Sequence, residues 1–94
     1  MASFGRVRIS DIRAMLDECA LEHEWHEKTH HYHIKWKDKA VYPSLPKGDH
    51  SKRGKRAGRA EIEIGHVRKM VRFLEIDIDC ANRMIPQLNL KQRT

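Results

Sequence analysis

The residues of this chain that could carry chemistry are concentrated in one short histidine-rich segment. Five of the seven histidines fall within residues 23–33, and they are His23, His26, His30, His31 and His33. An imidazole titrates near neutral pH, so it can take or give a proton, coordinate a metal ion, or simply occupy a wet surface. The segment therefore predicts acid/base chemistry, a metal site or an exposed polar face, and its neighbours decide among them.

The second half of this segment has the alternation of a half-buried β-strand. In residues 29–37, one face carries Tyr32, Ile34 and Trp36, and the other carries His31, His33, Lys35 and Lys37. On the wet face an imidazole could remove the proton from a ribose 2′-hydroxyl, while an ammonium stabilises the charge that builds on the phosphate. The pattern predicts RNA cleavage without a metal or cofactor. The alternative is an exposed polar strand face with no catalytic role.

The metal hypothesis is weaker because the ligand spacing does not fit. His31 and His33 share a strand face and His23 and His26 are three apart, but no standard zinc pattern results and no cysteine pair lies nearby. We therefore expect no native metal site.

The positive charge of the chain is concentrated in residues 47–60. This segment contributes a net +5 of the total +6, from Lys47, Lys52, Arg53, Lys55, Arg56 and Arg59 against one acid. It has three glycines and no apolar residue larger than alanine, so we expect a flexible loop. Such a loop can bind a nucleic-acid backbone through counterion release, and a plain solvated linker is the alternative.

Length and composition predict one domain over residues 1–94. The chain is 39% hydrophobic and 34% charged, which suits a modest core with a solvated segment. Cys19 and Cys80 are expected to be small buried hydrophobes rather than a disulfide, because two cysteines form no framework. No apolar run is long enough for a membrane span or a signal peptide, so the cytoplasm is the expected compartment.

Periodicity predicts one helix and three strands in the first half. Ser10 is a plausible N-cap for a helix over residues 10–20, and residues 21–28 have a weak strand signal. After the strand at 29–37 and a short turn, a third strand starts at Ala40 and is ended or confined to an edge by Pro43 and Pro46.

The second half is predicted to be helical. Apolar residues recur at helical spacing over residues 64–74, and Asp77 or Asp79 can cap a short third helix that Pro86 ends. The tail 87–94 is polar enough to fray.

This order of elements resembles the HicA-type mRNA interferase toxins, also called YcfA-like. The resemblance covers residues 7–76 and includes the histidine strand THHYHIKW, the segment VYPSLPKG, and Ile64, Gly65, His66 and Val67 at the second helix. It implies an α+β fold like a double-stranded-RNA-binding domain, α-β-β-β-α with a three-stranded antiparallel sheet. Residues 77–94 would be a C-terminal extension with an extra helix.

The resemblance also implies a function and its site. It implies a toxin-like endoribonuclease that cleaves messenger RNA and is inhibited by a HicB-type antitoxin. The catalytic histidine is His31 or His30, and strand alternation favours His31 because His30 would direct His33 into the core. On that model His33, Lys35, Lys37 and the basic segment contact RNA.

The chain departs from the family pattern at several positions. Lys28 and Thr29 stand where the family has Gly-Ser, and Ser44 stands near a family histidine. Two other hypotheses therefore stay open, an inactive RNA-binding or antitoxin-binding domain of the same fold, and an unrelated metal or interaction module.

Overall fold

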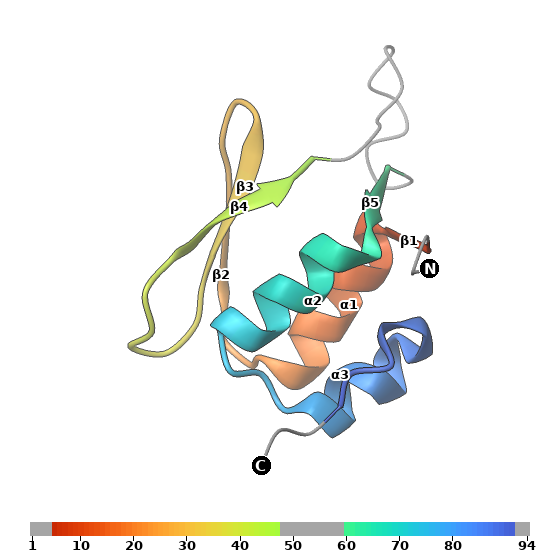
Figure 1. Cartoon of the computed structure of the whole chain (residues 1–94). Helices are drawn as coiled ribbons and strands as arrows, with labels where there is room; N and C mark the ends of the chain where they lie inside the picture. Colours follow the sequence, from red (N-terminus) through yellow and green to blue (C-terminus); the bar gives the residue numbers. More distant parts are fainter. Residues whose placement is uncertain (1–4, 48–59, 92–94) are drawn as a thin grey trace.

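A computed structural model describes residues 5–47 and 60–91 of the chain (Figure 1). In chain order its elements are β1 (Arg6–Arg8), α1 (Ile9–Cys19), β2 (Glu24–Glu27), β3 (His31–Lys35), β4 (Tyr42–Pro46), β5 (Glu61–Glu63), α2 (Ile64–Phe73), α3 (Ile78–Met84) and the 3-10 helix η2 (Pro86–Leu88). The protein is therefore of the α+β class. The predicted helices at 10–20 and 64–74 are confirmed to within one residue at each end.

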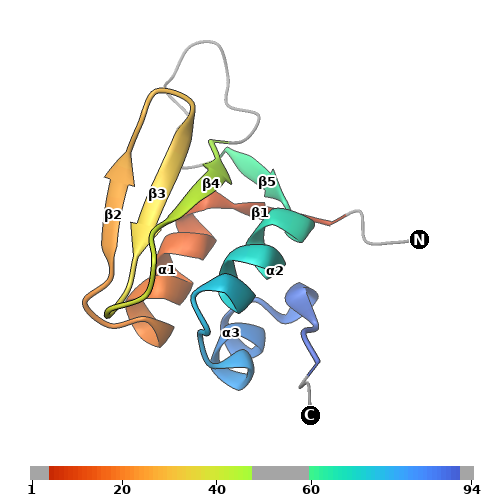
Figure 2. The same ribbon diagram turned by 60° about the vertical axis from the view of Figure 1, so that its left-hand side comes forward.

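Strands β2, β3 and β4 form an antiparallel sheet in that order, and α1 and α2 lie on one side of it (Figure 2). The inner face, towards the helices, buries Tyr32, Ile34, Tyr42 and Leu45. Trp25 is half-buried at the same face, between the Tyr32 ring at 4.5 Å and the Arg13 guanidinium of α1 at 4.7 Å. The expected burial of Tyr32 and Ile34 is thus confirmed, and Trp36 is half-buried just past the end of β3.

The edge strand β4 accommodates its two prolines through a bulge. Tyr32 pairs with Leu45 and Ile34 pairs with Tyr42, so that Pro43 and Ser44 together oppose one residue of β3. The prediction of an edge strand is confirmed, because β4 has a neighbour on one side within this sheet. The predicted start at Ala40 is wrong, since β4 begins at Tyr42 and runs through both prolines.

A second sheet of two strands was not predicted. Strand β1 pairs antiparallel with β5, and Val7 and Ile62 are register partners that are both buried. Strands of three residues give too short an alternation to be recognised in sequence. Ser10 is also not the N-cap of α1, because the helix starts from Arg8, which makes no side-chain capping bond.

The buried side chains form one apolar cluster between the sheet and the helices. Its largest fully buried members are Ile12, Met15, Leu16, Ile34, Leu45, Ile62, Ile64, Met70, Leu74, Leu88, Val67 and Val71. No polar or charged residue of the described part is buried. The histidines and the charged side chains of the described ranges therefore lie outside this core.

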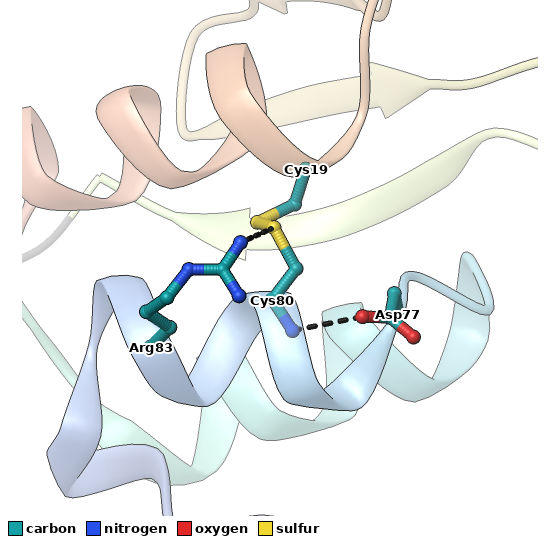
Figure 3. The surroundings of a disulfide bond; sticks show 4 residues. All are labelled: Cys19, Asp77, Cys80 and Arg83. Carbon is teal, nitrogen blue, oxygen red and sulfur yellow. Dashed lines mark hydrogen bonds between the residues drawn. A yellow bond between two sulfur atoms is a disulfide. The ribbon is translucent and has the colours of Figure 1, made fainter.

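The C-terminal segment is held against α1 by a disulfide bond (Figure 3). Cys19, the last residue of α1, is bonded to Cys80 in the first turn of α3, with their Cα atoms 5.8 Å apart. The prediction of two unbonded cysteines is therefore wrong. The predicted cap is confirmed, because the Asp77 carboxylate accepts a bond of 2.9 Å from the Cys80 amide.

The predicted fraying of the tail is wrong as far as residue 91. Leu88 and Leu90 are buried, and the Asn82 side-chain amide donates to the Leu90 carbonyl at 2.9 Å and accepts from the Leu90 backbone N–H at 2.8 Å. Arg68 of α2 donates to the Leu88 carbonyl at 2.8 Å. Two leucines in a polar tail are enough to anchor it when both are buried in the apolar cluster.

Candidate active site on the outer sheet face

The outer face of the three-stranded sheet carries the histidines that the sequence singled out. His31 is exposed and His33 is half-buried, while Tyr32 and Ile34 between and beside them are buried on the opposite face. The predicted orientation of this strand is confirmed. Successive outward residues of a strand are about 6.6–7 Å apart at the backbone, so the two imidazoles are neighbours along β3.

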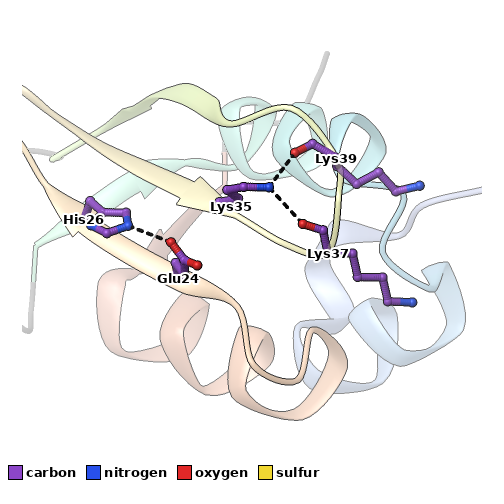
Figure 4. A network of polar contacts seen from close by, with 5 residues as sticks. All are labelled: Glu24, His26, Lys35, Lys37 and Lys39. Carbon is purple, nitrogen blue, oxygen red and sulfur yellow. Dashed lines mark hydrogen bonds and ion pairs between the residues drawn. The ribbon is translucent and has the colours of Figure 1, made fainter.

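His26 joins these two histidines from the neighbouring strand. It is the register partner of His33, and directly opposed residues of an antiparallel pair project to the same face. The Glu24 carboxylate lies 3.1 Å from His26 Nε2 (Figure 4). It accepts the hydrogen bond from this imidazole nitrogen, because an ionised carboxylate has no proton to donate. His26 belongs to the histidine-rich segment but was not among the predicted site residues. Hairpin register, which pairs residues 26 and 33 around the turn at 28–30, was the signal that could have found it.

His30 lies outside the strands, in the bend between β2 and β3. It is exposed, like His31, and the hairpin closes beside it through a bond of 2.9 Å from the Lys28 amide to the His31 carbonyl. His31 has a fixed place in the sheet, as the register partner of Pro46, which immediately precedes the basic segment. Of the two candidates, His31 shares its face with His33 and His26.

Lys35 shares the outer face but its ammonium is used within the protein. Its Nζ donates to the Lys37 carbonyl at 2.8 Å and to the Lys39 carbonyl at 3.2 Å, closing the turn between β3 and β4 (Figure 4). Four residues along a strand separate it from His31 by about 13 Å. Lys35 is therefore not an immediate neighbour of His31, and its contact with an RNA phosphate stays a prediction.

Lys37 and Lys47 also lie apart from the histidines. Lys37 is in the left-handed region, with φ 58°, and its Nζ is 4.3 Å from the centre of the Trp36 ring. Lys47 bonds Glu27 at 2.8 Å on the inner side of the sheet, and this bond and its charge lower the pKa of the Glu27 carboxyl. The other predicted RNA contacts lie outside the described residues, and they are Lys52, Arg53, Lys55, Arg56 and Arg59.

Within residues 5–47 and 60–91, no group of three or more histidine, cysteine, aspartate or glutamate side chains is placed to hold a metal ion. In the same ranges no helix is both long and apolar enough to cross a bilayer.

Comparison with known proteins finds no matching family model, no similar curated protein and no similar solved structure. Function must therefore be inferred from the side chains and their placement.

Proposed function

We propose that this protein is a toxin-like endoribonuclease of the HicA type, which cleaves messenger RNA by acid/base chemistry on the outer face of its sheet. The observation that carries the proposal is the exposed His31 ring, with the imidazoles of His33 and His26 on the same face. Histidines gathered on an open strand face can exchange protons with a bound substrate, whereas buried ones would serve packing.

The proposed relation to double-stranded-RNA-binding domains is supported by the order of the elements. A helix, three antiparallel strands and a second helix follow one another as α1, β2, β3, β4 and α2, with both helices on one side of the sheet (Figure 2). The short strands β1 and β5, and the segment from α3 onward, are additions to that order. Recognition of RNA shape and 2′-hydroxyls by such a domain predicts loose sequence preference.

In the proposed reaction His31 acts as the general base. Its neutral imidazole takes the proton of a ribose 2′-hydroxyl, and the resulting oxygen attacks the adjacent phosphorus. The bond from phosphorus to the 5′-oxygen of the next nucleotide breaks as the new bond forms. The products are a 2′,3′-cyclic phosphate and a 5′-hydroxyl, and the leaving 5′-oxygen must gain a proton.

The test uses the full-length protein and end-labelled RNA in buffer that contains EDTA. Wild-type protein is expected to yield fragments that end in a 2′,3′-cyclic phosphate, and to leave DNA of the same sequence intact because it lacks the 2′-hydroxyl. His31→Ala is expected to lower the cleavage rate by about 10²-fold or more. His66→Ala, which changes a half-buried histidine of α2, is the matched control.

Two results would decide between the hypotheses, and a third measurement tests the basic segment. RNA that is bound but not cut by wild-type protein would favour the inactive RNA-binding domain. Unchanged cleavage by both His31→Ala and His30→Ala would overturn the assignment of the base. Neutralising Lys52, Arg53, Lys55 and Arg56 is expected to weaken RNA binding and flatten its salt dependence.

The proposed setting is the cytoplasm, where messenger RNA is translated. Expression of the wild-type chain is then expected to arrest growth, and His31→Ala to relieve the arrest. A HicB-type antitoxin is the proposed inhibitory partner. Co-expression of the neighbouring reading frame, if it encodes that partner, should restore growth and co-purify with this chain.

A further inference from the structure

We infer that His26 is a second catalytic residue of the outer face, and that it protonates the 5′-oxygen that leaves when the RNA chain is cut. This inference rests on the proposed ribonuclease function, because it completes the proton transfer that His31 begins.

The register of the hairpin sets the spacing between the two imidazoles. His26 is directly opposite His33 and is therefore the diagonal cross-strand neighbour of His31. Such diagonal neighbours are about 7–8 Å apart at the backbone. In an in-line displacement the attacking and leaving oxygens lie on opposite sides of phosphorus. Two imidazoles at this spacing can each reach one of those oxygens within roughly 2.6–3.2 Å.

Glu24 fixes which nitrogen of the His26 ring is free. Its Oε1 atom is 3.1 Å from His26 Nε2, which leaves Nδ1 as the ring nitrogen that can face a substrate (Figure 4). A carboxylate at one ring nitrogen orients the imidazole and stabilises its positive charge, as in catalytic triads. Glu24 is thus a positioning residue, and His31 has no comparable carboxylate among the hydrogen bonds and ion pairs of the described residues.

Few other charged groups face His26. Strand β2 is an edge of the sheet, so the groups that face His26 from a neighbouring strand come from β3: His33 is directly opposite, and His31 and Lys35 are the diagonal neighbours. The Lys35 ammonium is directed to the carbonyls of the β3–β4 turn. Glu24 is therefore the charged group in direct contact with the His26 ring in the described structure.

Together the two histidines balance the protons of the complete cleavage step. His31 gains the 2′-hydroxyl proton as the 2′-oxygen bonds to phosphorus. His26, protonated at both ring nitrogens, gives its Nδ1 proton to the 5′-oxygen as the bond from phosphorus to that oxygen breaks. No redox partner is needed, and solvent exchange returns both histidines to their starting states.

A substrate with a better leaving group tests this assignment. In an RNA whose scissile 5′-oxygen is replaced by sulfur, the leaving thiolate needs no proton. His26→Ala is expected to lower cleavage of ordinary RNA by about 10²-fold or more, and to cleave the sulfur substrate within about 3-fold of the wild-type rate. His31→Ala should remain slow on both substrates. Glu24→Gln should show the same rescue as His26→Ala, from a smaller initial loss.

The outcomes separate this inference from the proposed function. If wild-type protein cuts ordinary RNA while His26→Ala does so at an unchanged rate, the inference is overturned and the proposed function stands. A His26→Ala defect that the sulfur substrate does not rescue, or a rescued defect in His33→Ala instead, also overturns it. If wild-type protein cuts neither substrate, both proposals fail. Thermal melting checks that each variant is folded, and His66→Ala again serves as the control.

Discussion

The two faces of the three-stranded sheet are built from alternate residues of the same strands, yet they have different roles. The inner face carries Tyr32 and Ile34, which are buried at 8% and 0% exposure against the helices. The outer face carries His31 and His33, which contact solvent. One face contributes to the free energy of folding through burial of apolar surface, and the other presents titratable groups at little cost to stability.

Because the two faces differ in this way, substitutions on them should have separable effects on stability and on activity. A change on the covered side should lower the free energy of unfolding, while a change on the open face should lower activity and leave the fold intact. The covered side includes the helices that pack on the inner face and α3, which the disulfide bond holds against α1. Three predictions test this separation.

The largest expected effect comes from the disulfide bond. A cross-link between residues separated by 61 positions lowers the entropy of the unfolded chain, which corresponds to about 4 kcal/mol of stability. Cys19→Ser with Cys80→Ser should lower the melting temperature of the oxidised protein by on the order of 20 °C. Calorimetry with and without a reducing agent would measure this.

The double variant should not respond to the reducing agent. An equal melting temperature for oxidised wild-type protein and the double variant would show that the bond does not stabilise the fold. RNA cleavage at a temperature where all forms are folded should be the same, because the bond joins α1 to α3, and these helices lie on the covered side of the sheet (Figure 1).

A matched pair on strand β3 tests the two faces directly. Ile34→Ala should lower the free energy of unfolding by about 3 kcal/mol, because it leaves a cavity in the core. His31→Ala should change it by about 0.5 kcal/mol or less, since the ring is exposed. Urea denaturation of both variants supplies the comparison. A loss of several kcal/mol in His31→Ala would mean that the outer face is needed for folding.

The smallest expected effect concerns a polar atom on the covered side. The Tyr42 hydroxyl is buried and has no hydrogen-bond partner among the described residues, and burial raises the pKa of that phenol. Tyr42→Phe removes this desolvated group and keeps the ring contact with Phe73 at 5.2 Å, so it should stabilise the fold by about 1 kcal/mol. Urea denaturation measures the change, and a loss of stability would show that the hydroxyl has a partner.

Much of the covered side could be predicted from the sequence. The spacing of Ile64, Val67, Met70 and Val71 is that of one helix face, and all four are buried in α2. Asp77 or Asp79 was expected to be a cap because a carboxylate there can reach an amide in the next turn, and the structure selects Asp77. Strand alternation also separated His31 from Tyr32, since a period of two is a property of the backbone itself.

The contacts of individual side chains were harder to predict, because they depend on which segments meet. Lys35 was assigned to the substrate, but the turn after β3 brings two carbonyls to its ammonium. Lys47 was assigned to RNA, but hairpin geometry puts Glu27 beside it. The pairing of β1 with β5 joins residues more than fifty positions apart, and short strands give no signal of their partners.

By itself, the sequence determined the local features of this protein: its helices, its central strand, the side of that strand on which each residue lies, and the segment that carries the excess charge. These follow from backbone period and from composition, which need no knowledge of distant contacts. Tertiary structure alone decided that Cys19 meets Cys80, that His26 lies opposite His33, and that two lysines are engaged within the protein. Each of these depends on packing between segments, because the distance between residues far apart in the chain is fixed only when the apolar faces of the helices and strands pack together.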